Sequence, residues 1–191
     1  LIKKIKFVTI IMIQLNKWIN IGATARQSGK TELACRIITH FSKEIKIIGV
    51  KISTIHKGDT LFHGNIAKLD KNFIIEKNIF SGKEKSTDRM LTAGASEVFW
   101  VHVKAEFYNE MLQKLIPQID KNAFVVCESN SLIKYAKPDV FLMINKQNTA
   151  IKDSASDVIK KAHHIIEYNG KEFLNFELSG IHINNEQWIL T

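Results

Sequence analysis

Residues 21–31 read IGATARQSGKT and carry the most specific pattern in the chain. They follow a short apolar run and open a stretch whose apolar residues recur at helical spacing, so a strand, a turn and a helix are predicted in that order. Gly29 would let the backbone approach an anion, because a Cβ would obstruct such a turn. The N–H groups at 28–31 would then face that anion at a helix N-terminus. The pattern predicts a phosphate-binding loop.

The residue types in this loop predict how it would hold a nucleotide. The Lys30 ammonium is expected to bridge the terminal phosphates, and the Thr31 hydroxyl to ligate Mg²⁺. Thr24 stands where the usual pattern has a glycine, five residues before Gly29, so the geometry at the start of the loop stays open. The predicted nucleotide contacts from this segment are Thr24, Ala25, Gln27, Ser28, Gly29, Lys30, Thr31 and Glu32.

Short apolar runs alternate with stretches of helical period along the chain. Strands are expected at 18–21, 45–52, 98–103, 123–127 and 140–144, and helices at 30–40 and around 107–115. Continuous apolar strands suit a sheet that is covered on both faces. With helices between the strands, right-handed crossovers give a parallel sheet. We therefore expect an α/β fold of three layers, α/β/α, with a mainly parallel sheet.

Three segments depart from this alternation. Residues 1–15 are interpreted as an upstream extension or an extra edge strand, and residues 16–191 as a single nucleotide-binding domain. Residues 53–86 are predicted to be a long insertion loop with a hairpin-like piece at 73–80, and a loop of that length in a compact domain is usually functional. The tail, residues 169–191, is expected to form short strands joined at Gly170 and Gly180.

A nucleoside-triphosphate site also needs an acid near the metal ion. Glu128 ends the apolar run at 124–127, and ligands collect at the carboxyl ends of parallel strands. We therefore assign Thr31 and Glu128 to Mg²⁺, and Lys30, Glu128 and Asp59 to catalysis. Asp59 competes with Glu128 for magnesium binding or would position the attacking water. A solvated carboxylate at a strand end is the alternative for Glu128.

A second polar group follows the apolar run at 140–144. Residues 145–148 read NKQN, which looks like a guanine-reading Asn-Lys-x-Asp tetrad with Asn148 in place of the Asp. An Asn side chain accepts hydrogen bonds with its oxygen alone and donates with its nitrogen, so this exchange weakens selectivity for guanine. Asn145 and Lys146 are the candidate base contacts, and a plain polar turn is the alternative.

Composition bounds the class of protein. The chain has 191 residues, and its 27 Lys and Arg against 19 Asp and Glu give a formal charge of +8, which favours an anionic partner such as a nucleotide. The basic residues are scattered, which argues against nucleic acid as a partner. Two cysteines form no disulfide framework, which favours a cytoplasmic location. The apolar run at 1–13 falls short of the roughly 20 residues of a membrane span, so no membrane partner is expected.

Four features occur in the same order as in a known family: the phosphate loop, residues 51–59, KSTDR at 85–89 leading to AGA at 93–95, and VVCESNS at 125–131. Over residues 16–166 the chain resembles the molybdopterin-guanine dinucleotide biosynthesis protein B (MobB-like) family, within the P-loop NTPase group that includes dethiobiotin synthetase. Two positions differ from the family pattern, because Ile52 follows Lys51 where a His is usual and Ser129 follows Glu128 where a Gly is usual.

The resemblance implies a homodimeric GTP-binding accessory protein of molybdenum-cofactor maturation, with weak hydrolysis and a partner protein. By position it implies that Lys30 and Thr31 hold the phosphates and Mg²⁺, with Glu128 beside the metal. One alternative is an ATP-dependent kinase or ligase of the dethiobiotin synthetase group, with residues 53–86 and 129–131 lining a substrate pocket. Another is an interaction module with a degenerate site.

Overall fold

The computed structural model describes residues 12–55, 71–83 and 85–191. Within these residues a main sheet of seven strands has the order β3-β4-β2-β5-β1-β6-β7. Every neighbouring pair is parallel except β3 and β4, which are antiparallel. In chain order the strands are β1 (Ile13–Ala23), β2 (Ile47–Ile55), β3 (Phe73–Lys77), β4 (Glu97–Lys104), β5 (Phe124–Glu128), β6 (Ala136–Lys146) and β7 (His164–Tyr168).

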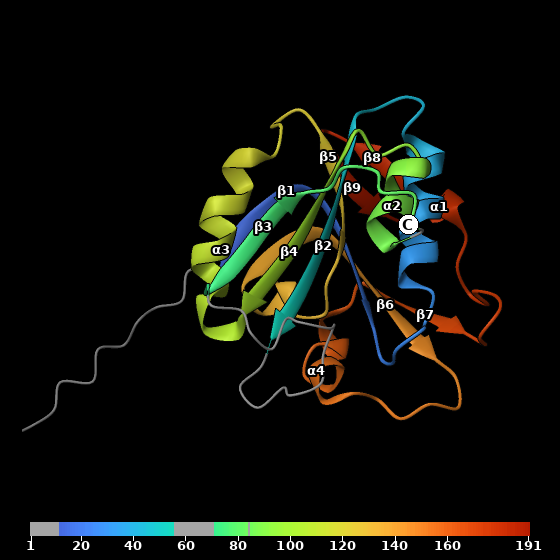
Figure 1. Cartoon of the computed structure of the whole chain (residues 1–191). Helices are drawn as coiled ribbons and strands as arrows, with labels where there is room; N and C mark the ends of the chain where they lie inside the picture. The colour runs from blue at the N-terminus through green and yellow to red at the C-terminus, as the bar shows by residue number, and fades with distance from the viewer. Residues whose placement is uncertain (1–11, 56–70, 84) are drawn as a thin grey trace, which may run out of the picture.

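Helices cover both faces of this sheet. Figure 1 shows α1 (Lys30–Phe41) and α2 (Ser86–Thr92) on one side and α3 (Tyr108–Leu115) on the other, with the short α4 (Asp153–Ser156) below. The prediction of an α/β fold with three layers and a mainly parallel sheet is confirmed. Within the described part of the chain, no helix combines the length and the apolar character that crossing a membrane requires.

Side chains alternate between the two faces of the sheet along the central strands, so the apolar core has one part on each face. In β5, Phe124 and Val126 pack with α1 and α2, whereas Val125 and Cys127 pack with α3. Successive side chains of a strand point to opposite faces, so a strand with helices on both sides must be apolar throughout. All five residues of β5 are accordingly buried, and Glu128 is the charged one among them.

The first strand begins earlier than expected, at Ile13 rather than at Trp18. Its register against β6 shifts between Leu15 and Ile19, and Lys17 within this bulge has a φ of 66°. The backbone N–H of Lys17 donates to Asp139 Oδ2 at 2.7 Å. Residues 13–15 of the predicted extension therefore belong to the central strand, while residues 1–11 lie outside the described residues.

The segment 53–86 is more regular than a loop wherever it is described. Residues 53–55 complete β2, and the hairpin-like piece expected at 73–80 is instead the single edge strand β3, paired with β4. A lone strand is stable there because the neighbouring strand supplies its hydrogen bonds. Residues 56–70 and 84 lie outside the described residues.

The tail forms a hairpin of β8 (Ile181–Asn184) and β9 (Gln187–Leu190), which meets the expectation of short strands. The connection differs, because the turn lies at Asn185 and Glu186, with φ of 48° and 59°, and not at a glycine. A two-residue hairpin turn of this type needs positive φ at both central residues. Gly180 instead ends a 3-10 turn before β8.

Candidate functional site

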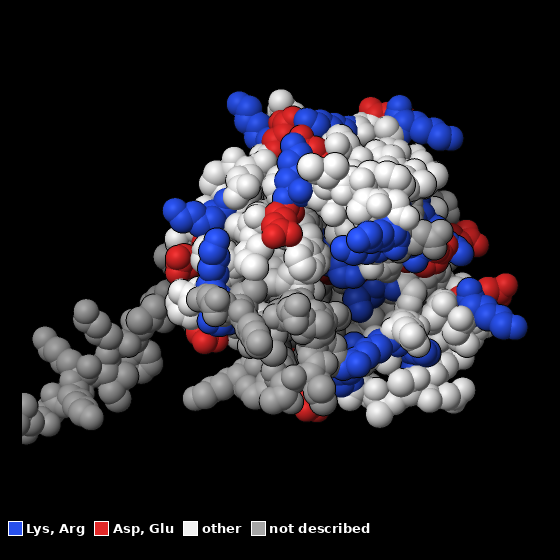
Figure 2. Space-filling view, in the orientation of Figure 1, with Lys and Arg blue, Asp and Glu red and all other residues white. Residues whose placement is uncertain are grey.

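A cleft of about 1610 Å³ opens at the carboxyl ends of the central strands. Its walls come from the loop between β1 and α1, the ends of β2 and β5, and the segments after β6 and β7. Figure 2 shows lysine and arginine side chains gathered around a hollow near the amino end of α1. The cleft therefore lies where parallel sheets bind ligands, and its surroundings favour an anion.

Gly29 gives the loop before α1 its shape. It is the N-cap residue of α1, with φ 76° and ψ 12°. A Cβ at this position would lie 3.0 Å from the ring of Phe173 and 3.4 Å from that of Tyr168, so both the backbone and the space favour glycine. The Gly29 carbonyl accepts the N–H of Leu33 at 2.8 Å. The N–H groups of the first helical turn have no acceptor within the helix, and no side chain caps them.

Thr24 anchors the start of the loop from behind. It is fully buried, its N–H donates to the Ile144 carbonyl at 2.9 Å, and its Oγ1 accepts the N–H of Lys146 at 3.0 Å. Its carbonyl accepts the N–H of Lys152 at 2.9 Å. These bonds account for each polar group of the residue, and Thr24 does not line the cleft. The structure thus gives this predicted contact an anchoring position.

The other loop residues named from the sequence line the cleft: Ala25, Gln27, Ser28, Gly29, Lys30, Thr31 and Glu32. The Ser28 hydroxyl donates to the Ala25 carbonyl at 2.6 Å, which tightens the turn. Glu32 is engaged by Arg36 Nε at 3.0 Å and by Arg89 Nη2 at 2.7 Å. The hydrogen bond from Arg36 is the largest cause of a lowered Glu32 pKa. Glu32 is therefore an ion-paired residue at the rim.

Asn130 joins the end of β1 to the segment after β5. Its Oδ1 accepts the N–H of Ala23, and its Nδ2 donates to the carbonyl of Ala23, both at 2.9 Å. This amide ties the end of β1, just before the loop that leads to α1, to the segment after Glu128. The two residues are 107 positions apart in the chain, so no local sequence pattern predicts this contact.

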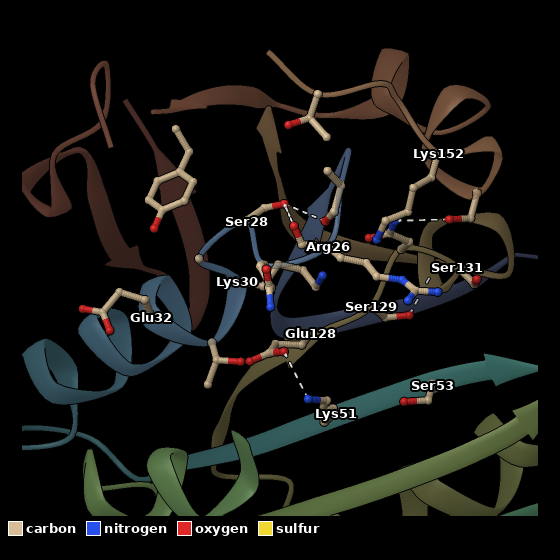
Figure 3. A pocket seen from close by; sticks show the side chains of 18 of the residues that line it. Arg26, Ser28, Lys30, Glu32, Lys51, Ser53, Glu128, Ser129, Ser131 and Lys152 are labelled. Atoms are coloured by element: carbon tan, nitrogen blue, oxygen red, sulfur yellow. Dashed lines mark hydrogen bonds and ion pairs between the residues drawn. The ribbon is translucent and has the colours of Figure 1, made fainter. Parts of the chain in front are cut away.

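Lys30 and Glu128 both line the cleft. Glu128 pairs with Ile21 of β1 on one side and with Lys51 of β2 on the other. Figure 3 shows Lys30, Glu128 and Lys51 around the floor of the cleft. The Lys51 ammonium lies 4.0 Å from Glu128 Oε2 and donates to Ser86 Oγ at 2.6 Å.

The electrostatics of this floor favour an additional ligand. Burial lowers the pKa of Lys30, the charge of Glu128 opposes that shift, and Lys51 adds to it. Glu128 is 3% exposed, and its Oε1 has no hydrogen-bond partner among the described residues. A buried carboxylate oxygen without a partner is costly unless a ligand satisfies it.

The residues proposed for base recognition lie apart from the cleft. The Asn145 amide donates to both carboxylate oxygens of Glu167, at 3.0 and 3.2 Å, and neither Asn145 nor Lys146 lines the cleft. The cleft residues contributed by the segment after β6, by the end of β7 and by the segment after β7 are Thr149, Ala150, Lys152, Asp153, Ser154, Asp157, Tyr168, Gly170 and Lys171. Asp59, proposed for catalysis, lies outside the described residues.

No family model matches the chain, and no curated protein matches it in sequence. Among solved structures, LpxK from Aquifex aeolicus, described as an "apo" form in complex with ATP, is similar with 14% sequence identity and a TM-score of 0.48. The similarity covers 88% of this chain and 54% of that chain, so the present chain spans about half the length of LpxK. A likeness this distant assigns no activity to the chain.

Proposed function

We propose that this protein binds a Mg²⁺–nucleoside triphosphate in the cleft and hydrolyses it slowly. The observation that carries the proposal is one juxtaposition. The left-handed Gly29 turn at the start of α1, the half-buried Lys30 and the buried Glu128 all line the cleft at the carboxyl edge of the sheet. Free N–H groups and a lysine suit a polyphosphate, and the adjacent carboxylate suits the metal that accompanies it.

The residues of the cleft fit a divalent cation of this kind. Among the described residues no group of three His, Cys, Asp or Glu side chains is placed to hold a metal by itself. Mg²⁺ instead needs one or two protein oxygens together with phosphate oxygens and water. The unpartnered Oε1 of Glu128 and the Thr31 hydroxyl, which also lines the cleft, are the proposed protein contacts.

Hydrolysis would depend on charged and dipolar groups that the fold positions before the nucleotide binds. The helix N-terminus and Lys30 would neutralise the charge that grows on the terminal phosphate, and a carboxylate would orient the attacking water. Glu128 is the described candidate for that role, and Asp59 stays a proposal. We expect a low rate without a partner protein that completes the site.

The family resemblance extends this proposal to GTP as the nucleotide, to molybdenum-cofactor maturation as the process, and to a homodimer as the assembly. Guanine selectivity through Asn145 and Lys146 would require these two residues to turn toward the cleft. The clasp between Asn145 and Glu167 makes GTP and ATP equal candidates for the first measurement.

The test is a thermal-shift and calorimetry panel of GTP, GDP, ATP and ADP, each with and without Mg²⁺. We expect a Mg²⁺-dependent shift with at least one triphosphate in the wild type. Lys30→Met removes the charge at similar length and should abolish that shift, because the loop then lacks the ammonium proposed to bridge the terminal phosphates. Glu128→Gln should remove most of the Mg²⁺ dependence while the fold persists.

The matched control is Lys43→Met, which alters an exposed lysine just beyond the end of α1 and outside the cleft. It should bind as the wild type does. Undiminished affinity in Lys30→Met, or the absence of any nucleotide effect on the wild type, contradicts the proposal.

A second candidate function is transfer of the terminal phosphate to a small substrate, or activation of that substrate with ATP. The size of the cleft favours it, since small-molecule sites commonly occupy about 300–1,000 Å³ and this cleft is larger. Ser53, Thr54 and Ser131 extend its lining beyond the phosphate loop. ADP release that depends on an added acceptor would support this function, and binding with negligible turnover favours the accessory role.

A further inference from the structure

Lys152 is held against the back of the phosphate loop by its main chain. Its N–H donates to the Thr24 carbonyl at 2.9 Å, and its own carbonyl accepts the N–H groups of Ala155 and Ser156 at 2.9 and 3.1 Å. It therefore caps α4 while docking on the segment that precedes Gly29. Both sides of the residue are tied, so the direction in which its side chain leaves the backbone is defined.

That direction is into the cleft. Lys152 lines the cleft, and Figure 3 shows its side chain running from the segment before α4 toward Arg26, on the side of the site where Ser131 also lies. Burial, followed by the charges of Lys30 and Arg26, lowers the pKa of Lys152 to about 8. Lys152, Lys30 and Arg26 all line the same cleft, so the three cations face one common space.

The two aspartates near Lys152 in the chain do not neutralise its ammonium through an ion pair. Asp157 is paired with Lys134 at 3.0 Å, and Asp153 forms no ion pair among the described residues. The Lys152 ammonium likewise forms no hydrogen bond or ion pair among the described residues. A half-buried ammonium beside another lysine is unfavourable unless an anion lies between them.

We propose that Lys152 is a second lysine contact for the terminal phosphate of the nucleotide, delivered by the segment between β6 and α4. This inference rests on the proposed function, because it needs a nucleotide on the Gly29 loop. It adds that the chain itself supplies a second cation to the cleft, from the segment before α4. Thr24 connects the loop before α1 to the segment that carries Lys152. Its carbonyl accepts the N–H of Lys152, and its own N–H donates to Ile144 in β6.

The role predicts discrimination by phosphate number. A diphosphate bound in the loop would still meet the helix N-terminus and Lys30, whereas the Lys152 contact would be made with the third phosphate. A hydrogen bond to a charged group contributes roughly 1.5–3 kcal/mol, which corresponds to about tenfold or more in affinity. Loss of the side chain should therefore weaken triphosphate binding selectively.

The experiment is calorimetry of the full chain with a non-hydrolysable triphosphate and with the diphosphate of the same base, both with Mg²⁺. For Lys152→Gln we expect triphosphate affinity to fall by about tenfold or more while diphosphate affinity holds. Lys152→Arg retains the charge and should recover most of the loss. Lys160→Gln, at an exposed lysine on the following turn, is the matched control and should bind as the wild type does.

A structural role would give a different result. Lys152→Gln removes a cation that Lys30 and Arg26 repel. The thermal unfolding temperature of the ligand-free variant should therefore equal that of the wild type or lie slightly above it. Equal losses for the two nucleotides, or no loss for either, overturn the assignment of Lys152 while the proposed function stands. Failure of the wild type to bind any nucleotide removes the proposed function itself, and this inference with it.

Discussion

Thr24 stands where the usual phosphate-loop pattern has a glycine, and its contacts explain why a side chain fits. Its φ is not among the positive values of the described backbone, so this position makes no demand for glycine. The Thr24 hydroxyl supplies a hydrogen-bond acceptor to the N–H of Lys146 at the end of β6. A glycine would keep the two main-chain bonds and lose this one.

Thr24→Val is therefore expected to destabilise the protein. The exchange keeps the shape of the side chain and removes the acceptor from a part-buried N–H, which costs about 1–3 kcal/mol. Chemical denaturation measures the change in the free energy of unfolding. Thr24→Ser keeps the hydroxyl and should lie closer to the wild type, and a Val variant as stable as the wild type would show that water satisfies Lys146.

At the scale of elements, one buried carboxylate organises the connection between β3 and α2. Asp88, in α2, accepts hydrogen bonds from the Asn78 amide at 3.0 Å, the Ser81 hydroxyl at 2.7 Å, and the N–H groups of Ser81 and Lys83 at 3.2 Å each. The loop that it holds displays Phe80, which is 61% exposed. Asp88 thus fixes the shape of the loop between β3 and α2.

The stability that Asp88 contributes should depend on pH. The Ser81 hydroxyl is the first cause of a pKa lowered to about 2, and burial opposes it. Since the folded pKa lies below the ordinary value, this contribution is complete above about pH 4 and is lost as the pH falls toward 2. Asp88→Asn should lower the thermal unfolding temperature at pH 7 and converge with the wild type near pH 2.

Asp157→Asn is the control for that comparison, because it alters an exposed surface ion pair that contributes little. It should follow the wild type over the whole range of pH. A constant difference between Asp88→Asn and the wild type from pH 7 to pH 2 would contradict the role assigned to the ionised carboxylate.

Elements that depend on local patterns were predicted well, and those that depend on distant partners were not. The helix expected at 30–40 is α1, Lys30–Phe41, because capping and helical spacing are local signals. The meeting of Lys30 and Glu128 followed from the rule that parallel strands end at one edge. The docking of Lys152 on Thr24 and the early start of β1 were missed, because each depends on a contact more than 100 positions away.

At the scale of the whole molecule, Trp188 packs into the core at the end of the central strands that lies opposite the cleft. Its ring is 1% exposed and meets those of Phe41 and Phe124 edge-on, with centroids 5.0 and 5.3 Å apart. Its Nε1 donates to the Lys17 carbonyl at 3.0 Å. The C-terminal hairpin is thereby attached to β1, α1 and β5 through one side chain.

Trp188→Ala is expected to destabilise the protein by about 3–5 kcal/mol, because it leaves a cavity among packed rings. Trp188→Phe keeps much of the packing and should cost less, the difference reflecting the lost N–H and the smaller ring. Denaturant unfolding followed by far-UV circular dichroism measures both variants. A small and equal effect of the two would show that the hairpin is peripheral to the core.

One oxygen atom links the two ends of the described fold. Asp139 Oδ2 accepts the N–H of Lys17 in the bulge of β1 and the N–H of Trp188 in β9, at 2.7 and 3.1 Å. During synthesis the ribosome makes Lys17 long before Trp188. The bulge in the first strand therefore gains its second clamp only after residue 188 has emerged, so a nascent chain halted earlier would hold a central strand whose junction is still unfinished.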